Sequence, residues 1–113
     1  MPRVLILEDE PLIAMMVEGW LDDLDCRAVG PVNSVAGALA LIAADKPDAA
    51  ILDISLRGEE SYPVADVLAA SGIPFAFTTG HPTHHIAEAH ANAPVLAKPY
   101  DFDGFKAVLA ALL

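Results

Sequence analysis

The chain has 113 residues, of which 55 % are hydrophobic, and this supplies enough apolar surface for one compact domain with a buried core. That composition argues against intrinsic disorder. Sixteen acidic against six basic side chains give a formal net charge of −10, which repels phosphate backbones and anionic lipids, so we expect neither nucleic acid nor a membrane surface among the direct partners.

Short apolar runs alternate with stretches of helical periodicity along the whole chain. The first run, residues 4–7, is continuously apolar, as expected of a central parallel strand covered on both faces. Further strands are predicted at 26–29, 49–52, 73–78 and 94–97. Helices are predicted at 12–24, from an N-cap at Ser34 to about Asp45, at 63–70, at 83–91 and after a cap at Asp101, and a loop is predicted at 55–60.

Five strands that alternate with five helices on short connections predict an α/β fold. We expect an open, five-stranded parallel sheet with helices on both faces, built as (βα)5 with right-handed crossovers. In such sheets, functional groups collect beyond the carboxyl ends of the strands. The residues that follow each strand are therefore the candidates for function.

Four of the predicted strands end in side chains that can do chemistry: Glu8-Asp9-Glu10, Asp53, Thr78-Thr79 and Lys98. If all strands are parallel, these groups meet at one edge of the sheet. Crowded carboxylates raise one another's pKa unless a cation is present, and hard oxygen ligands suit Mg²⁺. An ammonium and a hydroxyl nearby would complement a phosphoryl group. Together these residues predict a site for phosphoryl transfer onto an aspartate.

With these residues in place, the chain resembles the receiver domains of two-component response regulators over essentially its whole length. The resemblance rests on four segments in order: VLILEDEP at 4–11, ILDISLRG at 51–58, TG at 79–80 and AKPY at 97–100. The segment PFAFTTGH at 74–81 is similar to the Pro-Phe-x-Phe-Ala-Thr-Gly-aromatic signature of mainly single-domain bacterial receivers. The resemblance implies the flavodoxin-like strand order 2-1-3-4-5.

It also implies roles for individual residues. Asp53 would be the phosphoacceptor, Thr79 would bond to one phosphoryl oxygen, and Lys98 would pair with another. The implied ligands of Mg²⁺ (or Mn²⁺) are Glu8, Asp9, Asp53 and the backbone carbonyl of Ser55. In related receivers the peptide bond that corresponds to Lys98–Pro99 is cis. The phosphodonor would be a phosphohistidine on a sensor histidine kinase or a histidine phosphotransfer protein.

The chain departs from the family pattern in three places. Thr78 replaces the usual Ala of the signature, and His81 replaces its aromatic residue. Most receivers carry Tyr or Phe three residues before the lysine, where this chain has Val95. The usual coupling between the threonine and that aromatic residue therefore cannot operate, although this does not affect phosphorylation itself.

Three other functions compete with this interpretation. A flavodoxin-like cofactor-binding module would need a phosphate loop rich in Gly and hydroxyls after the first strand, where this chain has carboxylates that repel phosphate. A phosphatase would use Asp9 as its nucleophile. A receiver-shaped binding protein would never be phosphorylated. We expect the protein to have no enzymatic activity beyond self-dephosphorylation at Asp53.

All four histidines lie between residues 81 and 90. The pairs His81 with His85 and His84 with Glu88 have helical spacing, so a zinc site is conceivable, but no cysteine supports it. The simpler hypothesis is a polar, partly solvated fourth helix that includes His90.

The remaining expectations concern location and contacts. The single cysteine, Cys26, excludes an internal disulfide, and four apolar residues at the N-terminus are too few for a signal peptide, so we expect a cytoplasmic protein. Residues 1–113 are expected to form one receiver domain with no output domain, which would then act on an unknown downstream protein. Leu12, Met15 and Met16 extend the apolar surface of the first helix and form either a docking face or a generously packed core.

Overall fold

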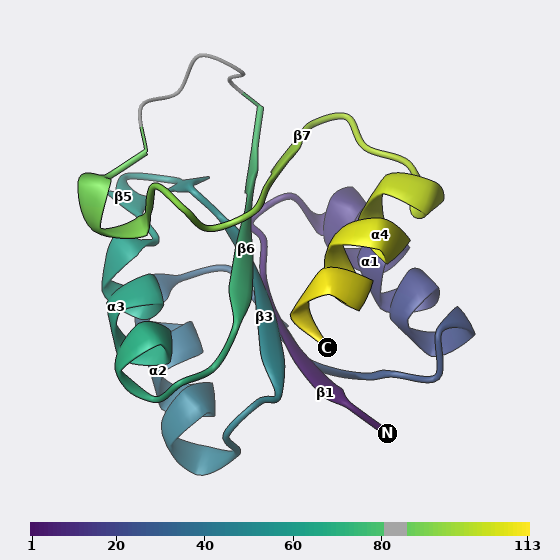
Figure 1. Ribbon diagram of the computed structural model, residues 1–113, viewed down its shortest axis with the longest axis horizontal. Helices are drawn as coiled ribbons and strands as arrows, with labels where there is room; N and C mark the ends of the chain where they lie inside the picture. Colours follow the sequence, from purple (N-terminus) through teal and green to yellow (C-terminus); the bar gives the residue numbers. More distant parts are fainter. Residues whose placement is uncertain (81–85) are drawn as a thin grey trace.

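The computed structural model describes residues 1–80 and 86–113 (Figure 1). Within these residues the strands are β1 (Arg3–Leu7), β2 (Arg27–Val32), β3 (Ala49–Asp53), β4 (Ser55–Leu56), β5 (Glu59–Glu60), β6 (Phe75–Thr79) and β7 (Val95–Ala97). The α-helices are α1 (Pro11–Asp23), α2 (Val35–Ala44), α3 (Tyr62–Ala70) and α4 (Phe102–Leu112), and a single turn of 3-10 helix, η1, covers Glu88–His90. None of the helices in these two ranges combines the length and hydrophobicity that a bilayer-spanning segment needs.

The five long strands form one parallel sheet in the order β2-β1-β3-β6-β7. In terms of the five predicted strands this is the order 2-1-3-4-5, so the predicted fold class and topology are confirmed. The central strands are buried on both faces because their side chains are apolar throughout: Val4 to Leu7 in β1 and Ala49 to Leu52 in β3 are almost fully inaccessible.

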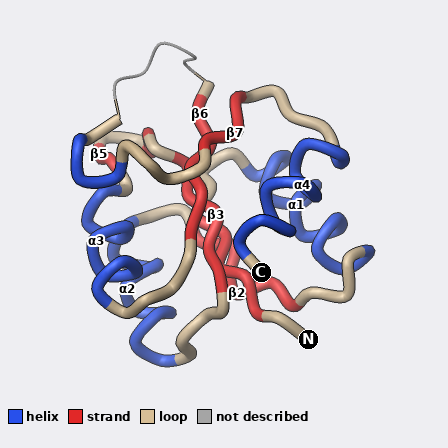
Figure 2. Tube along the Cα trace, viewed as in Figure 1, coloured by secondary structure: helices blue, strands red, loops and turns tan. Residues whose placement is uncertain are grey.

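Helices cover both faces of the sheet (Figures 1 and 2). On one face, α2 and α3 enclose a core that includes Leu5, Leu52 and Phe77. On the other face, α1 and α4 enclose a second core that includes Ile6, Leu21 and Phe105. Successive residues of β1 thus enter opposite cores, as the alternation of side chains along a strand requires.

Side-chain caps begin two of the helices where the sequence predicts them. The Oγ of Ser34 accepts a hydrogen bond from the backbone N of Gly37 at 3.1 Å, and Oδ1 of Asp101 accepts one from Gly104 at 2.8 Å. Each bond satisfies a backbone donor that the first turn of a helix leaves without an intrahelical partner. These caps fix the starts of α2 and α4.

Two segments differ from the sequence-based expectation at their backbone. The predicted loop at 55–60 is an antiparallel hairpin of β4 and β5, in which Arg57 and Gly58 form the two-residue turn. Gly58 has φ +77°, a conformation that glycine adopts without a Cβ penalty. The predicted second strand also continues through Gly30 and Pro31, whose peptide bond is cis, to Val32.

The predicted fourth helix at 83–91 is wrong in the part of it that the structure describes. His81, His84 and His85 lie outside the described residues, and the remainder contains only the 3-10 turn η1. A regular helix here would have had Ile86 as its one large apolar residue, too little to stabilise it by packing. Local helical propensity therefore does not decide the structure of this segment.

His90 is buried rather than solvated, which corrects the second part of that hypothesis. Its Nε2 lies 2.7 Å from Oδ1 of Asp66 on α3, and its ring lies parallel to Tyr62 with centroids 6.2 Å apart. The rings of Phe75 and Phe77 meet it edge-on. Aromatic contacts from α3 and β6 therefore hold this histidine in the core.

Candidate functional site

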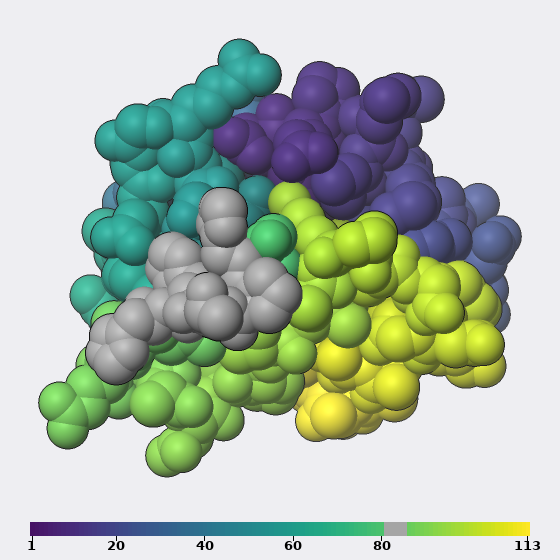
Figure 3. All heavy atoms as spheres, turned by 90° about the horizontal axis from the view of Figure 1, so that it is seen from above, coloured from purple at the N-terminus to yellow at the C-terminus, as the bar shows by residue number. Residues whose placement is uncertain are grey.

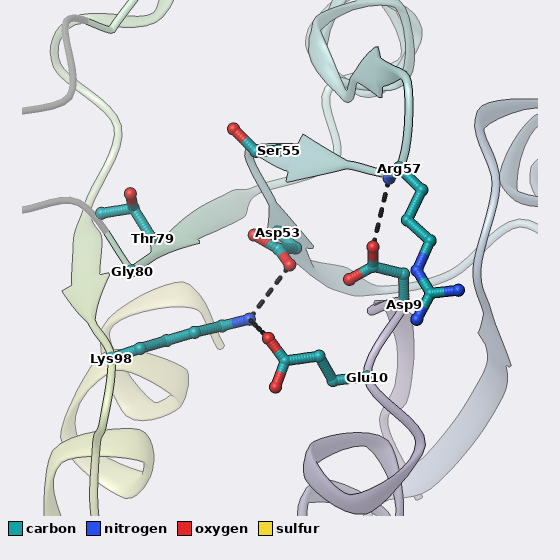
Figure 4. A pocket seen from close by; sticks show the side chains of 8 residues that line it. All are labelled: Asp9, Glu10, Asp53, Ser55, Arg57, Thr79, Gly80 and Lys98. Atoms are coloured by element: carbon teal, nitrogen blue, oxygen red, sulfur yellow. Dashed lines mark hydrogen bonds and ion pairs between the residues drawn. The ribbon is translucent and has the colours of Figure 1, made fainter.

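A pocket of about 410 Å³ opens at the carboxyl edge of the sheet. Its lining residues come from the ends of β1, β3, β6 and β7 and from the β4–β5 hairpin: Asp9, Glu10, Asp53, Ser55, Arg57, Thr79, Gly80 and Lys98 (Figure 4). Figure 3 looks down on this edge, where the purple residues that follow β1 lie beside the teal hairpin. The structure thus brings together five of the six residues singled out in the sequence for phosphorylation and metal binding.

Parallel register places these groups. Leu7 pairs with Leu52, so the residues that follow β1 lie beside Asp53 at the end of β3. Asp53 pairs with Thr78, and Thr79 pairs with Ala97, so Lys98 follows directly at the end of β7. The backbone N of Lys98 donates to the carbonyl of Thr79 at 2.7 Å, which fixes where the lysine side chain starts.

Glu8, the sixth of those residues, lies at the base of this region and is buried. One of its oxygens, Oε1, lies 2.9 Å from Nζ of Lys98, while Oε2 accepts a hydrogen bond from the backbone N of Glu10 at 3.1 Å. The Lys98 ammonium also lies 3.0 Å from Oδ2 of Asp53 and 3.8 Å from Oε1 of Glu10. One ammonium is therefore shared by two buried carboxylates and approached by a third, exposed one.

Burial and the bonds around Lys98 together set the pKa values of this group. Loss of hydration raises the pKa of Glu8 to about 7, although its hydrogen bond with Lys98 opposes this. The same loss raises the pKa of Asp53, again against the effect of Lys98. For Lys98, burial by itself would lower the pKa, but the bonds to Glu8 and Asp53 outweigh it and raise the pKa above its usual range. The lysine is thus held in its charged form.

The acidic residues after β1 have the chemistry of a site for a hard divalent cation. One carboxylate oxygen each from Glu8, Asp9 and Glu10 lie within 4.8 Å of one another. Asp9 reaches the pocket, and its Oδ2 accepts a hydrogen bond from the backbone N of Arg57 at 3.1 Å. An all-oxygen set beside an open pocket with room for water suits Mg²⁺, which uses one or two carboxylates and keeps several waters. These residues fit the predicted metal.

Two pocket residues, Arg57 and Gly80, received no role from the sequence, and Glu10 was counted only among the carboxylates that follow the first strand. For Arg57 no local signal was available, because Arg-Gly is not one of the pairs typical of two-residue hairpin turns and strands of two residues show no periodicity. The Lys98–Pro99 peptide bond is cis, as the resemblance implied. Val95, at the position usually aromatic, is 41 % exposed on the edge strand.

Comparison with known proteins identifies the family. The model described as "Response regulator receiver domain" matches residues 4–110. The solution structure of SdrG from Sphingomonas melonis Fr1 superposes with a TM-score of 0.88 at 51 % identity, over 99 % of this chain and 96 % of that one. The solution structure of the BeF3-activated conformation of SdrG from Pseudomonas melonis Fr1 gives 0.84 at 52 % identity, over 98 % and 95 %.

A second relative is longer than this chain. The phyllosphere-induced regulator PhyR of Methylorubrum extorquens is 31 % identical over 98 % of this chain but only 43 % of its own length, so this chain spans less than half of PhyR. The family match covers nearly every element that builds the pocket, and it argues against the flavodoxin-like and phosphatase hypotheses. The protein therefore belongs to the receiver domains of the response regulators, proteins of two-component signalling.

Proposed function

We propose that this receiver accepts a phosphoryl group on Asp53 from a phosphohistidine of a sensor histidine kinase or a histidine phosphotransfer protein. The observation that carries the proposal is the placement of Asp53 in an open pocket, 3.0 Å from the ammonium of Lys98 and beside a cluster of carboxylate oxygens. Nucleophile, cation and acidic cluster are the parts that phosphoryl transfer to a carboxylate requires.

In the transfer, an Oδ atom of Asp53 forms a bond to phosphorus while the phosphorus–nitrogen bond of the phosphohistidine breaks. The electron pair of that bond stays on the imidazole nitrogen, which takes a proton from solvent. Lys98 exchanges one of its carboxylate partners for a phosphoryl oxygen, and the Thr79 hydroxyl donates to another. Because transfer leaves charge on the phosphoryl oxygens, donors fixed in advance stabilise the transition state.

Mg²⁺ fits this proposal as the cofactor. Its ligands would be Glu8, Asp9, Asp53 and the backbone carbonyl of Ser55. When bound, the ion supplies positive charge that offsets the carboxylates and the phosphoryl oxygens. Glu8, one of these ligands, is bonded to Lys98, so we expect binding of the metal and release of the lysine to be coupled.

We further propose that the kinase or phosphotransfer protein docks on α1. Leu12, Met15 and Met16 on this helix are 81 %, 67 % and 37 % exposed, which rules out the alternative that they fill the core. They lie in the first two turns of α1, which begins directly after Glu10, a residue of the pocket. A partner seated on this apolar surface would bring its phosphohistidine to the pocket mouth.

The output is proposed to be a contact with a downstream protein. Residues 1–113 are proposed to act as one receiver domain, since SdrG matches this chain over 96 % of the SdrG chain. A cytoplasmic location belongs to the same proposal.

The proposal is tested with a small-molecule phosphodonor and Mg²⁺, followed by intact mass measurement. We expect the wild-type protein to gain the mass of one phosphoryl group and the Asp53→Ala variant to gain none. Omission of Mg²⁺ should abolish most of the gain. An unchanged mass of the wild-type protein, or equal gains by both proteins, would contradict the proposal.

A further inference from the structure

The pocket contains a second cation besides Lys98. Among the described residues that line it, Arg57 is the only arginine, and it sits on the turn of the β4–β5 hairpin, exposed to solvent. Figure 4 shows its side chain on the opposite side of Asp53 from Thr79 and Lys98, along the wall that carries Asp9. The pocket is therefore lined by two cations, one directly after β7 and one on the β4–β5 turn.

The two cations differ in what holds them. Lys98 is mostly buried and is bonded to Glu8 and Asp53. Arg57 lies at the rim, where its guanidinium can meet solutes before they reach the buried lysine. A guanidinium presents a planar set of donors that matches phosphoryl oxygens, and it keeps its charge at any working pH.

The net negative charge of the protein explains why a cation at the position of Arg57 would affect the approach of an anion. With sixteen acidic against six basic residues, the molecule repels a phosphorylated anion at long range, and the pocket itself carries Asp9, Glu10 and Asp53. A bound divalent cation offsets part of this charge only inside the site. An exposed arginine at the rim provides local attraction where an incoming anion first arrives.

The hairpin that carries Arg57 is tied down at two places. The backbone N of Arg57 donates to Oδ2 of Asp9, and Oε2 of Glu59 accepts a hydrogen bond from the backbone N of Val35 at the start of α2, both at 3.1 Å. Because these bonds use the backbone of residue 57 and the side chain of a different residue, they persist when the arginine side chain is replaced. The guanidinium can thus be removed without releasing the hairpin.

We propose that Arg57 recognises the dianionic phosphoryl group of the incoming phosphodonor and guides it to Asp53. This deepens the proposed function and rests on it. The arginine acts on the approach of the donor and not on the bond that breaks, so its effect depends on donor charge and on ionic strength. Asp53, Lys98 and the metal retain their roles in the transfer itself.

The test compares two small donors of different charge. Acetyl phosphate is a dianion near neutral pH, whereas phosphoramidate carries a smaller negative charge. Apparent second-order rate constants for phosphorylation are measured by intact mass at saturating Mg²⁺, since loss of a nearby cation also changes metal affinity. The variants are Arg57→Ala and Arg57→Lys, with Arg27→Ala as the matched control, because Arg27 is an exposed arginine at the opposite, amino-terminal end of the sheet.

We expect Arg57→Ala to slow the reaction with acetyl phosphate by about threefold to fivefold, the size of one exposed charge interaction. The effect on phosphoramidate should be clearly smaller, Arg57→Lys should restore most of the rate, and high salt should shrink the difference from wild type. Equal slowing with both donors, or the same effect from Arg27→Ala, would overturn the inference. No phosphorylation of the wild-type protein would instead overturn the proposed function, and this inference with it.

Discussion

The ammonium of Lys98 lies 3.0 Å from the carboxylate of Asp53, and both side chains are largely buried. Glu8 competes for the same ammonium at 2.9 Å, so two buried negative charges share one positive charge. Without a metal the group carries an excess negative charge in a region of low hydration. The protein thus stores repulsion at the site that a cation or a neutralising substitution can relieve.

Substitution of either partner tests this balance. We expect Asp53→Asn to raise the free energy of unfolding of the metal-free protein by about 1 kcal/mol, because one ammonium then faces one carboxylate. Lys98→Ala should lower it by about 3 kcal/mol, because two carboxylates lose their counter-ion. Urea denaturation measures both. Lys106→Ala is the control, because Lys106 is an exposed lysine on α4, and its free energy of unfolding should stay within about 0.5 kcal/mol of the wild-type value. Destabilisation by Asp53→Asn would contradict the account.

The raised pKa of Glu8 predicts a pH dependence with a definite sign. The folded state favours the protonated carboxyl, so its contribution to stability is fully present below the ordinary glutamate pKa and is lost as the pH rises through about 7. In metal-free buffer, wild type and Glu8→Gln should therefore have similar stability near pH 4.5, and wild type should be less stable by about 2 kcal/mol near pH 8.

Denaturation curves of the two proteins across this range measure the difference. The control is Glu10→Gln, whose side chain is 61 % exposed and should produce no such divergence. A constant difference between wild type and Glu8→Gln at all pH values would show that Glu8 does not titrate in this way.

Magnesium should stabilise the folded protein. A ligand that binds only the folded state at ten times its Kd adds about 1.4 kcal/mol to the free energy of unfolding. We expect a corresponding rise in the Tm of the wild-type protein with Mg²⁺. The rise should be lost in the Asp9→Ala variant. It should be kept in the control variant Asp22→Asn, because Asp22 is an exposed aspartate on α1. Equal responses of the two variants to Mg²⁺ would place the ion elsewhere.

The bond between His90 and Asp66 should contribute to stability independently of the pocket. A double-mutant cycle with His90→Phe and Asp66→Ala keeps an aromatic ring against Tyr62 and Phe77 while it removes the hydrogen bond. We expect a coupling energy of about 1 kcal/mol. His90→Ala should cost more, about 2 kcal/mol, since it also removes the ring contacts. Strict additivity in the cycle would mean that the bond contributes nothing.

The sequence predicts the sheet and most of the pocket because both depend on local patterns. Apolar runs such as that before Glu8 mark buried parallel strands, and right-handed crossovers leave few topologies. The order 2-1-3-4-5 among them is implied by the resemblance to receiver domains. Once the strands are parallel, the residues after them must meet at one edge. Asp9, Asp53 and Lys98 are therefore brought together by topology.

The remaining features depend on contacts that no local pattern encodes. The β4–β5 hairpin has strands of only two residues, too short for periodicity, and exists because Gly58 adopts a positive φ. His90 is buried because rings from α3 and β6, distant in sequence, surround it. In the same way, the bond of Glu8 to Lys98 joins residues ninety positions apart. These are tertiary effects that override local propensity.

The central claim is that the phosphoryl group is carried by Asp53, and borohydride reduction tests it most directly. Borohydride reduces an aspartyl phosphate to homoserine with release of phosphate, which marks the modified position permanently. After reaction with acetyl phosphate and Mg²⁺, reduction and peptide mapping by mass spectrometry, the account predicts homoserine at position 53 alone. Homoserine at position 9, or its absence from the whole chain, would contradict it.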